Sequence, residues 1–346
     1  MHLHTLRYRR RSGGMAVKRM KQLGFLAICC VMALVVSACG KGELQQVNVG
    51  EVTRSIFYAP QYVAIEKGFF EEEGLKIELA TIPGGDKTMT ALLSDGIDVA
   101  LVGSETSIYV TAQGASDPIK NFAQLTQTDG TFLVAREKID NFTWDMLKGS
   151  TFLGQRKGGM PQMAGEFVLK QHGIEPHNDL TLIQNIDFAN IATAFASGTG
   201  EYVQLFEPSA SVFEQEGIGH IVASFGTESG HLPYTAFMTK ASSIENDPEL
   251  FEKFTRAIKK AQDWVYDNSA EDVAKAIQPY FDNTDIELIA TVVERYRAQQ
   301  SYALDPIIDE QEWNQLQDVM EEAGELPKRV DYGELVDTSF AEKVSK

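Results

Sequence analysis

Apolar and polar residues alternate along this chain as short β-branched runs separated by longer amphipathic stretches. The runs at 47–52, 75–82 and 97–103 (VNVGEV, LKIELATI, IDVALVG) predict strands, and the stretches at 59–74 and 87–96 predict the helices between them. This βαβαβ order favours a mostly parallel sheet with helices on its faces.

The same pattern starts again after Lys148. Strands are predicted at 150–155, 180–186, 201–206 and 219–226, with helices at 160–173, 188–198 and 208–217. The segments 131–135 and 234–238 look like strands that cross between two lobes, and the region from there to Glu325 is mostly helical. We therefore predict an α/β protein with two mostly parallel sheets, flanked by helices and joined by two crossing strands. The first lobe takes 47–134 plus 235–346, and the second takes 135–234.

The first 38 residues have the composition of an export signal. Basic residues precede an apolar run from Leu23 to Val36, and the small residues Ser37 and Ala38 follow it. The run is shorter than the ~20 residues that a membrane-spanning helix needs. We predict a signal peptide over 1–38, and the sequence leaves open whether translation starts at Met1 or Met15.

The segment Val36-Ser37-Ala38-Cys39 resembles the lipobox of bacterial lipoproteins. This resemblance implies that Cys39 is lipidated, that 39–46 is a tether, and that the protein is anchored to the outer face of the cell membrane. The alternative is an ordinary signal peptide cleaved near Ala38. In either case Cys29 and Cys30 fall inside the signal, so we expect no disulfide.

The net charge of the chain excludes some classes of binding partner. The chain carries −18, and loss of the seven basic residues in 1–38 would leave −25. An acidic surface of this kind repels nucleic acid, so we expect no nucleic-acid partner. No metal-binding spacing and no catalytic motif stand out, and we expect a monomer without metal or cofactor.

Three segments carry a family resemblance: SIFYAPQYVAIEKGFFEEEGLKIEL (55–79), GGDKTMTALLSDGIDVALVGSE (84–105) and LKGSTFLGQRKGGMPQMAGEFVLKQHGI (147–174). They resemble the solute-binding proteins of bacterial ABC importers, in the NMT1-like branch that includes binders of alkanesulfonates and of thiamine pyrimidine precursors. The resemblance implies the periplasmic-binding-protein fold, a small solute, and a permease with its ATPase as partners. The branch also has eukaryotic pyrimidine synthases with a cysteine cluster, which this chain cannot supply, so an enzyme is the minor alternative. A surface sensor lipoprotein is the other.

Ligands of open α/β sheets lie beyond the carboxyl ends of the strands, so the loops after each strand hold the candidate site. In the first lobe the predicted ligand-binding residues are Phe57, Tyr58, Gly85, Asp86, Ser104 and Glu105. In the second lobe they are Arg156, Gly158, Gly159, Met160, Asp187, Phe188, Asn190 and Glu207, and Tyr234 lies on a crossing strand.

The chemistry of these loops points in two directions. Gly84-Gly85 and Gly158-Gly159 precede helices, where backbone amides favour an anion such as a sulfonate. Aromatic residues and the carboxylates of Glu105, Asp187 and Glu207 instead favour a planar ring with amino or protonated nitrogens. We expect Asp129, by contrast, to face solvent. The preferred ligand is a thiamine pyrimidine precursor, followed by another planar heterocycle such as riboflavin, with an alkanesulfonate or taurine as the alternative.

Overall fold

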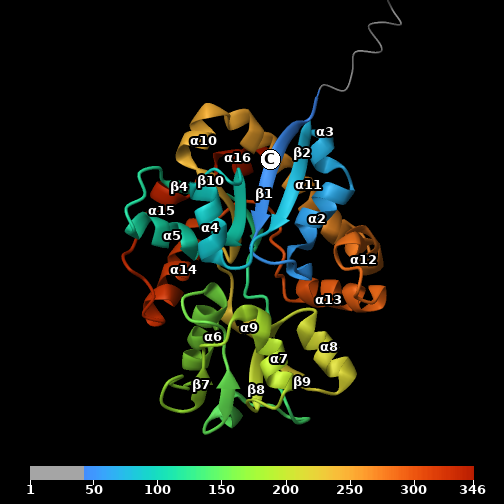
Figure 1. Cartoon of the computed structure of the whole chain (residues 1–346), viewed down its shortest axis with the longest axis vertical. Coiled ribbons are helices and arrows are strands. Elements are labelled where there is room, and N and C mark those ends of the chain that lie inside the picture. Colours follow the sequence, from blue (N-terminus) through green and yellow to red (C-terminus); the bar gives the residue numbers. More distant parts are fainter. Residues whose placement is uncertain (1–42) are drawn as a thin grey trace, which may run out of the picture. The chain divides into compact units, whose positions relative to one another are not determined.

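Two five-stranded sheets organise residues 43–346, which are the part of the chain that our computed structural model describes. The predicted signal peptide, Cys39 and most of the tether lie outside the described residues. Gln45–Lys346 form one compact unit, with the first sheet in its upper part and the second in its lower part in Figure 1. No helix in 43–346 has both the length and the apolar character to cross a membrane.

The first sheet has the strand order β2-β1-β3-β10-β4. Its strands are β1 (Gln45–Glu51), β2 (Leu75–Thr81), β3 (Val99–Gly103), β4 (Ile119–Thr126) and β10 (Thr235–Lys240). β1 is parallel to β2 and β3, whereas β10 is antiparallel to both β3 and β4. The sequence pattern predicted all of these strands except β4.

The second sheet has the order β7-β6-β8-β5-β9. Its strands are β5 (Thr131–Ala135), β6 (Thr151–Leu153), β7 (Thr181–Ile183), β8 (Tyr202–Phe206) and β9 (His220–Ser224). β6 is parallel to β7 and β8, and β5 is antiparallel to β8 and β9. In each sheet the single reversed strand is the one that crosses from the other lobe, so the predicted two-lobed α/β fold is confirmed.

The predicted boundary between the two lobes is wrong, because it places strand β5 in the first lobe. We assigned 131–134 to the first lobe, but β5 pairs along its whole length with β8. All five residues of β5 are buried, so its sequence has no polar face that could indicate which sheet it joins.

Helices cover both sheets. In the first lobe they are α2 (Ala59–Glu66), α3 (Phe69–Glu72), α4 (Gly85–Leu93), α5 (Glu105–Ala112), α10 (Ala241–Asn246), α11 (Pro248–Asp267), α12 (Ala270–Ile277), α13 (Ile286–Ala298), α14 (Glu310–Glu322), α15 (Tyr332–Leu335) and α16 (Ser339–Val344), with 3₁₀ turns η1 (Ile56–Tyr58) and η4 (Gln278–Tyr280). In the second lobe they are α6 (Met160–Gln171), α7 (Ile191–Ala196), α8 (Ser209–Glu216) and α9 (Phe225–Ser229), with 3₁₀ turns η2 (Trp144–Leu147) and η3 (Phe188–Asn190).

The long helix α11 shows how the sequence builds the first lobe. The Asp247 side chain accepts a hydrogen bond from Leu250 N, and Pro248 occupies the first turn, so the start of the helix is well defined. Its apolar face is buried, and Phe254 lies edge-on to Phe122 and Phe237 of the sheet at 5.6 and 5.0 Å between ring centroids.

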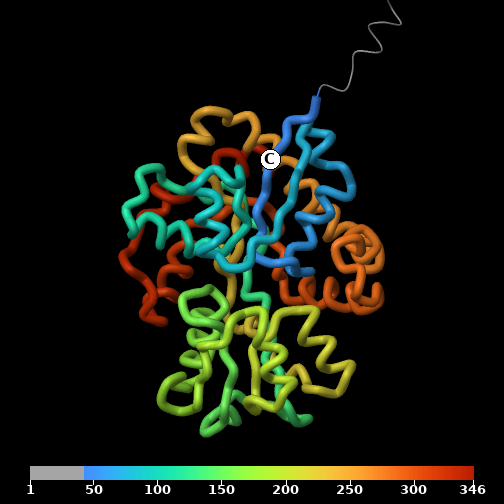
Figure 2. Tube along the Cα trace, in the orientation of Figure 1, coloured from blue at the N-terminus to red at the C-terminus, as the bar shows by residue number. Residues whose placement is uncertain are grey.

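The chain passes between the lobes twice, from β4 to β5 and from α9 to β10, as the tube in Figure 2 shows. The two linking segments are 127–130 and 230–234. The C-terminal helices belong to the first lobe, but α14 also packs on α6 of the second lobe. The two lobes are therefore held by side-chain contacts as well as by the two crossings.

Candidate functional site

A cavity of about 370 Å³ lies between the lobes, at the carboxyl ends of the strands of both sheets. Loops after β1, β2 and β3 line it from the first lobe, and loops after β6 and β7, with Phe206 at the end of β8, line it from the second. This is the place that the strand order predicts for a ligand.

Most of the predicted ligand-binding residues line this cavity. They are Tyr58, Gly85, Asp86, Glu105, Arg156, Gly159, Met160, Asp187, Phe188, Asn190 and Tyr234. The structure brings these residues together from six separate loops or strand ends; that they bind a ligand remains a prediction.

Three of the predicted residues do not line the cavity. Phe57 is fully buried and packs on Phe206 and Tyr234, with ring centroids at 5.9 and 5.6 Å. The Ser104 hydroxyl is buried and donates to the Pro233 carbonyl. Gly158 N donates to Gln162 Oε1 at 2.9 Å, which ties this glycine to the first turn of α6. Each supports the wall without reaching the cavity.

The prediction for Glu207 is wrong in its geometry. Glu207 follows β8 as expected, but its carboxylate points into the protein, where Ser211 N and Ser211 Oγ donate to it at 2.9 and 2.8 Å. Arg295 from α13 forms an ion pair with the same carboxylate. Because these groups already satisfy the carboxylate, Glu207 has no free acceptor for a ligand.

Other residues on the cavity wall carried no chemical signal in the sequence. Val52, Thr53, Val102, Pro161 and Thr235 line the cavity because of their position at strand ends. Small and apolar residues of this kind shape most of a ligand pocket, and only the strand assignments could have identified them. Lys87 also reaches the cavity, one residue beyond the predicted Asp86.

Glu105 is the most unusual polar group in the cavity. It is the first residue of α5, its side chain is buried, and its Oε1 accepts a hydrogen bond from Met160 N of the second lobe at 3.3 Å. Its Oε2 is buried without a hydrogen-bond partner among the described residues. Burial raises the pKa of Glu105 to about 7, although the Met160 hydrogen bond acts in the opposite direction.

Gly103 makes room for this carboxylate. A Cβ atom at position 103 would lie 2.1 Å from Glu105 Oε2, which is far inside van der Waals contact. A side chain at position 103 would displace the Glu105 carboxylate, so glycine permits Glu105 to fold back along the end of β3.

Aromatic rings form the apolar part of the cavity wall. Tyr58 and Tyr234 come from the first lobe and the crossing, and Phe188 and Phe206 come from the second lobe. Phe188 is 43% exposed and lies edge-on to Phe206 at 5.7 Å. Rings from both lobes therefore face the same space, as the binding of a planar group requires.

The entrance of the cavity carries opposite charges. Arg156 of the second lobe lies 3.8 Å from Asp86 of the first lobe, and both side chains are more than half exposed. An exposed pair at this distance contributes about 0–1 kcal/mol, so it opposes opening of the lobes only weakly.

Asp129 is buried, which corrects our expectation that it faces solvent. Its side chain has no exposed area, and its Oδ1 accepts from Thr131 N at 2.6 Å and from the Thr131 hydroxyl. Asp129 Oδ2 and the Tyr234 hydroxyl are both buried without a hydrogen-bond partner among the described residues. Asp129 lies in one crossing and Tyr234 in the other, so tertiary structure and not local sequence buries this carboxyl.

Replacing Asp129 with asparagine should remove part of the pH dependence of stability. Burial raises the pKa of Asp129 to about 6 against the hydrogen bonds from Thr131, so the folded protein holds this proton to a higher pH than the unfolded chain does. The free energy of unfolding therefore falls as pH rises from about 4 to 6. Asparagine keeps the Oδ1 acceptor but carries no charge. At pH 7.5 we therefore expect Asp129→Asn to be more stable than the parent by on the order of 2 kcal/mol. At pH 4 we expect no gain in stability. Urea unfolding at both pH values measures this; identical profiles would contradict it.

Comparisons with known proteins agree with this architecture. The NMT1-like family model matches residues 40–278. The chain is 61% identical over 331 residues to the Bacillus subtilis (strain 168) protein named "Putative binding protein YtlA", covering 95% of this chain and 99% of that protein. It is also 27% identical over 261 residues to 4-amino-5-hydroxymethyl-2-methylpyrimidine phosphate synthase of Aspergillus parasiticus, covering 71% of this chain and 72% of that enzyme.

Solved structures show the same fold. The alkanesulfonate-binding protein SsuA of Xanthomonas axonopodis pv. citri, bound to MOPS, superposes with a TM-score of 0.67 at 19% identity, covering 86% of this chain and 100% of that one. The periplasmic nitrate-binding protein NrtA of Synechocystis PCC 6803 also has a TM-score of 0.67, at 18% identity, covering 88% and 89% of the two chains. The family that the sequence resembles is thereby confirmed: this chain belongs to the NMT1-like family and has the fold of the periplasmic binding proteins.

Proposed function

We propose that this protein is the substrate-binding subunit of an ABC importer, and that it captures a planar nitrogen heterocycle such as a thiamine pyrimidine precursor between its two lobes. The lobes would close on the solute, and a membrane permease with its ATPase would receive it. The fold, the family and the cavity between the lobes support this role.

Glu105 carries the proposal for the ligand class. Its buried Oε2 is an acceptor without a donor in residues 43–346, and a ligand that brings an N–H group or a protonated nitrogen would supply one. The aromatic rings of Tyr58, Phe188 and Phe206 would enclose the flat faces of the same ligand. Because an unpaired buried carboxylate is costly, such a ligand gains both a contact and the relief of that cost.

A sulfonate is the second candidate, supported by a different set of groups. Arg156 and Lys87 line the cavity, and Gly85 and Gly159 lie where α4 and α6 begin. Cations and backbone amides together could hold an anion. The ionised form of Glu105 repels such a ligand, and for this reason we place it second.

The cellular setting follows from the N-terminal sequence. We propose that a signal peptide over 1–38 is removed, that Cys39 is lipidated, and that the monomeric protein works at the outer face of the cell membrane.

The similarity of this chain to a pyrimidine phosphate synthase supports the choice of a pyrimidine ligand. We propose binding and not synthesis, because 43–346 contain no cysteine and no cluster of metal-ligating side chains.

The proposal can be tested by measuring the thermal shift of the protein with a panel of ligands. We expect the purified protein to be stabilised by 4-amino-5-hydroxymethyl-2-methylpyrimidine, or by another planar amino heterocycle, and not by taurine or longer sulfonates. A ligand at a hundred times its Kd stabilises by about 2.7 kcal/mol, which is readily detected. A shift with sulfonates alone would transfer the proposal to the second candidate. No shift with any member of the panel would refute both ligand classes.

A further inference from the structure

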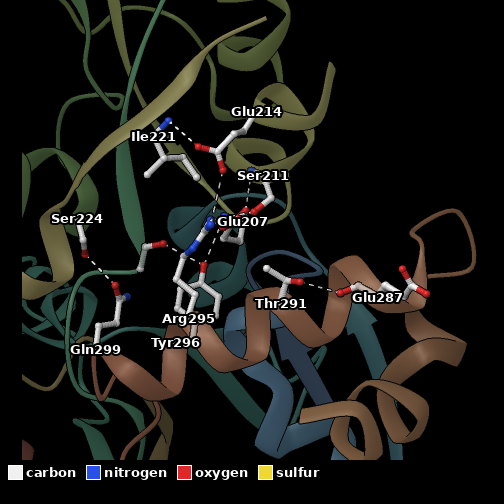
Figure 3. Close-up of polar contacts among 11 residues, drawn as sticks. Glu207, Ser211, Glu214, Ile221, Ser224, Glu287, Thr291, Arg295, Tyr296 and Gln299 are labelled. Atoms are coloured by element: carbon white, nitrogen blue, oxygen red, sulfur yellow. Dashed lines mark hydrogen bonds and ion pairs between the residues drawn. The ribbon is translucent and has the colours of Figure 1, made fainter. Parts of the chain in front are cut away.

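Helix α13 of the first lobe joins the second lobe through a buried ion pair. Arg295 of α13 pairs with Glu207, and its Nη1 donates to Ser211 Oγ at 2.9 Å. The Glu207 side chain has no exposed area, and that of Arg295 is 27% exposed. Figure 3 shows the guanidinium of Arg295 reaching from α13 into the group formed by Glu207, Ser211 and Glu214. None of these residues lines the cavity.

Tyr296 of the same helix and Gln299, directly after its last residue, extend this contact. Tyr296 OH donates to the Gly130 carbonyl at 2.9 Å, and Glu207 N donates to Tyr296 OH at 3.4 Å. One turn further on, Gln299 Oε1 accepts from Ser224 Oγ at 2.8 Å. Gly130 lies in the first crossing, so α13 contacts the second lobe beside the point where the chain passes between the lobes.

The contacts between the lobes differ greatly in the cost of breaking them. Arg156 with Asp86, both on the cavity wall, and Lys157 with Glu325 are separated by 3.8 and 3.7 Å and include well-exposed side chains. Water replaces such exposed partners at little cost in free energy. Separating Arg295 from Glu207 would leave a carboxylate with no exposed area without its counter-charge, which is strongly unfavourable.

We propose that the Arg295–Glu207 pair is a fixed pivot: it stays intact while the lobes open at the cavity entrance, and Arg295 thereby acts as a positioning residue that sets ligand affinity without touching the ligand. This inference rests on the proposed capture of a solute between the lobes. Phe206, which lines the cavity, directly precedes Glu207, so the pivot also fixes one wall of the cavity. With the pivot lost, the lobes sample more arrangements, and the measured Kd rises as the fraction in the binding-competent arrangement falls.

The test separates position from stability with two variants and a control. Arg295→Met alone leaves Glu207 buried and unpaired, so it should also destabilise the protein. The double variant Arg295→Met/Glu207→Gln removes both charges and keeps an acceptor for Ser211, and should regain much of that stability. Arg297→Met is the matched control, because Arg297 lies on the same helix and its partners, the Val265 and Asn268 carbonyls and the Glu294 carboxylate, belong to the first lobe.

Two measurements are made on each protein. Small-angle X-ray scattering without ligand should give a larger radius of gyration for both Arg295 variants than for the parent and the Arg297 control. Calorimetric titration with 4-amino-5-hydroxymethyl-2-methylpyrimidine should show about tenfold weaker binding by the double variant, as expected if the competent fraction falls to about a tenth. A double variant that matches the parent in radius of gyration would overturn the proposal. Should the pyrimidine bind none of the proteins, the proposed ligand fails, and the scattering still decides on the pivot.

Discussion

Replacing Glu105 with glutamine is expected to weaken binding of 4-amino-5-hydroxymethyl-2-methylpyrimidine by about 30- to 100-fold. The unpaired Oε2 of Glu105 is the acceptor that we assign to the ligand, and a hydrogen bond to a charged group contributes about 1.5–3 kcal/mol. Glutamine has the same shape and can still accept the Met160 N hydrogen bond. The glutamine amide has no charge, and its NH2 group can face the donor of the ligand. We therefore expect Glu105→Gln to lose ligand affinity but not folding stability.

The same residue should make binding pH-dependent in the parent protein. The pKa of Glu105 is about 7 without ligand, so the carboxyl is mostly protonated at pH 6 and mostly ionised at pH 8. A ligand that donates to Oε2 prefers the ionised form and lowers this pKa, so affinity should rise between pH 6 and 8 and then level off. Because the folded pKa is raised, this group also lowers the stability of the ligand-free protein as pH rises from about 4.5 to 7. A bound ligand would donate a hydrogen bond to the ionised Glu105 carboxylate and so offset this loss of stability.

Isothermal titration at pH 6, 7 and 8 measures both effects. The control is Glu78→Gln, because Glu78 lies on β2, is 48% exposed and pairs with Lys76 at the surface. We expect the control to keep the affinity and pH profile of the parent, and Glu105→Gln to show weak binding with a flat profile. Equal affinities for Glu105→Gln and the parent would remove Glu105 from the ligand site.

Sequence periodicity was sufficient to locate most of the candidate site. Alternating runs placed the strands, and the loops that follow them, including Asp86, Arg156 and Asp187, do meet at one cavity. This works because the carboxyl ends of parallel strands lie at one edge of a sheet, wherever the strands fall in the chain. Periodicity could not give the direction of each side chain. Glu207 has the expected place after β8, but Arg295, 88 positions away, turns its carboxylate inward.

The crossings were the hardest region to predict for a similar reason. Residues of β5 are buried on both faces, and Asp129 is buried although it lies in a linking segment. Gly130 shows how closely the lobes pack there: a Cβ at this position would lie 2.8 Å from the Phe57 ring and 2.9 Å from the Phe206 ring. Phe57 and Phe206 come from different lobes, and no local pattern encodes such a contact between distant segments.

Replacing Glu51 with alanine should cost about 3–5 kcal/mol of the free energy of unfolding. Glu51 is the last residue of β1, and its carboxylate has no exposed area. Four side chains donate to it: Arg54 Nε at 2.6 Å, Tyr62 OH at 2.7 Å, Thr81 Oγ1 at 2.8 Å and Gln61 Nε2 at 2.9 Å. Alanine would leave these four donors without their acceptor in the interior, and the cost arises from those groups more than from the lost carboxylate.

Urea unfolding of three variants separates the possible causes of this loss. Glu51→Gln keeps one acceptor oxygen and the volume of the side chain, so we expect it to lose less than Glu51→Ala but still to be less stable than the parent. Glu249→Gln is the surface control, because Glu249 is 76% exposed and pairs with Lys253 within one helix; its loss should stay below about 0.5 kcal/mol. A loss below 1 kcal/mol for Glu51→Ala would mean that water or another acceptor can satisfy the donors.

The effect of Glu51 should extend to the cavity. Val52 and Thr53, which line the cavity, directly follow Glu51, and Tyr62 and Thr81 connect the same carboxylate to α2 and to the end of β2. Glu51 thus fixes the carboxyl ends of β1 and β2 at the edge where a ligand would bind. In Glu51→Gln, which should remain folded, we therefore expect pyrimidine affinity to fall together with stability, whereas Glu105→Gln should lose affinity alone. Two buried glutamates of the same lobe would then have separate roles, since one has all its acceptors occupied by protein donors and the other keeps one free for the ligand.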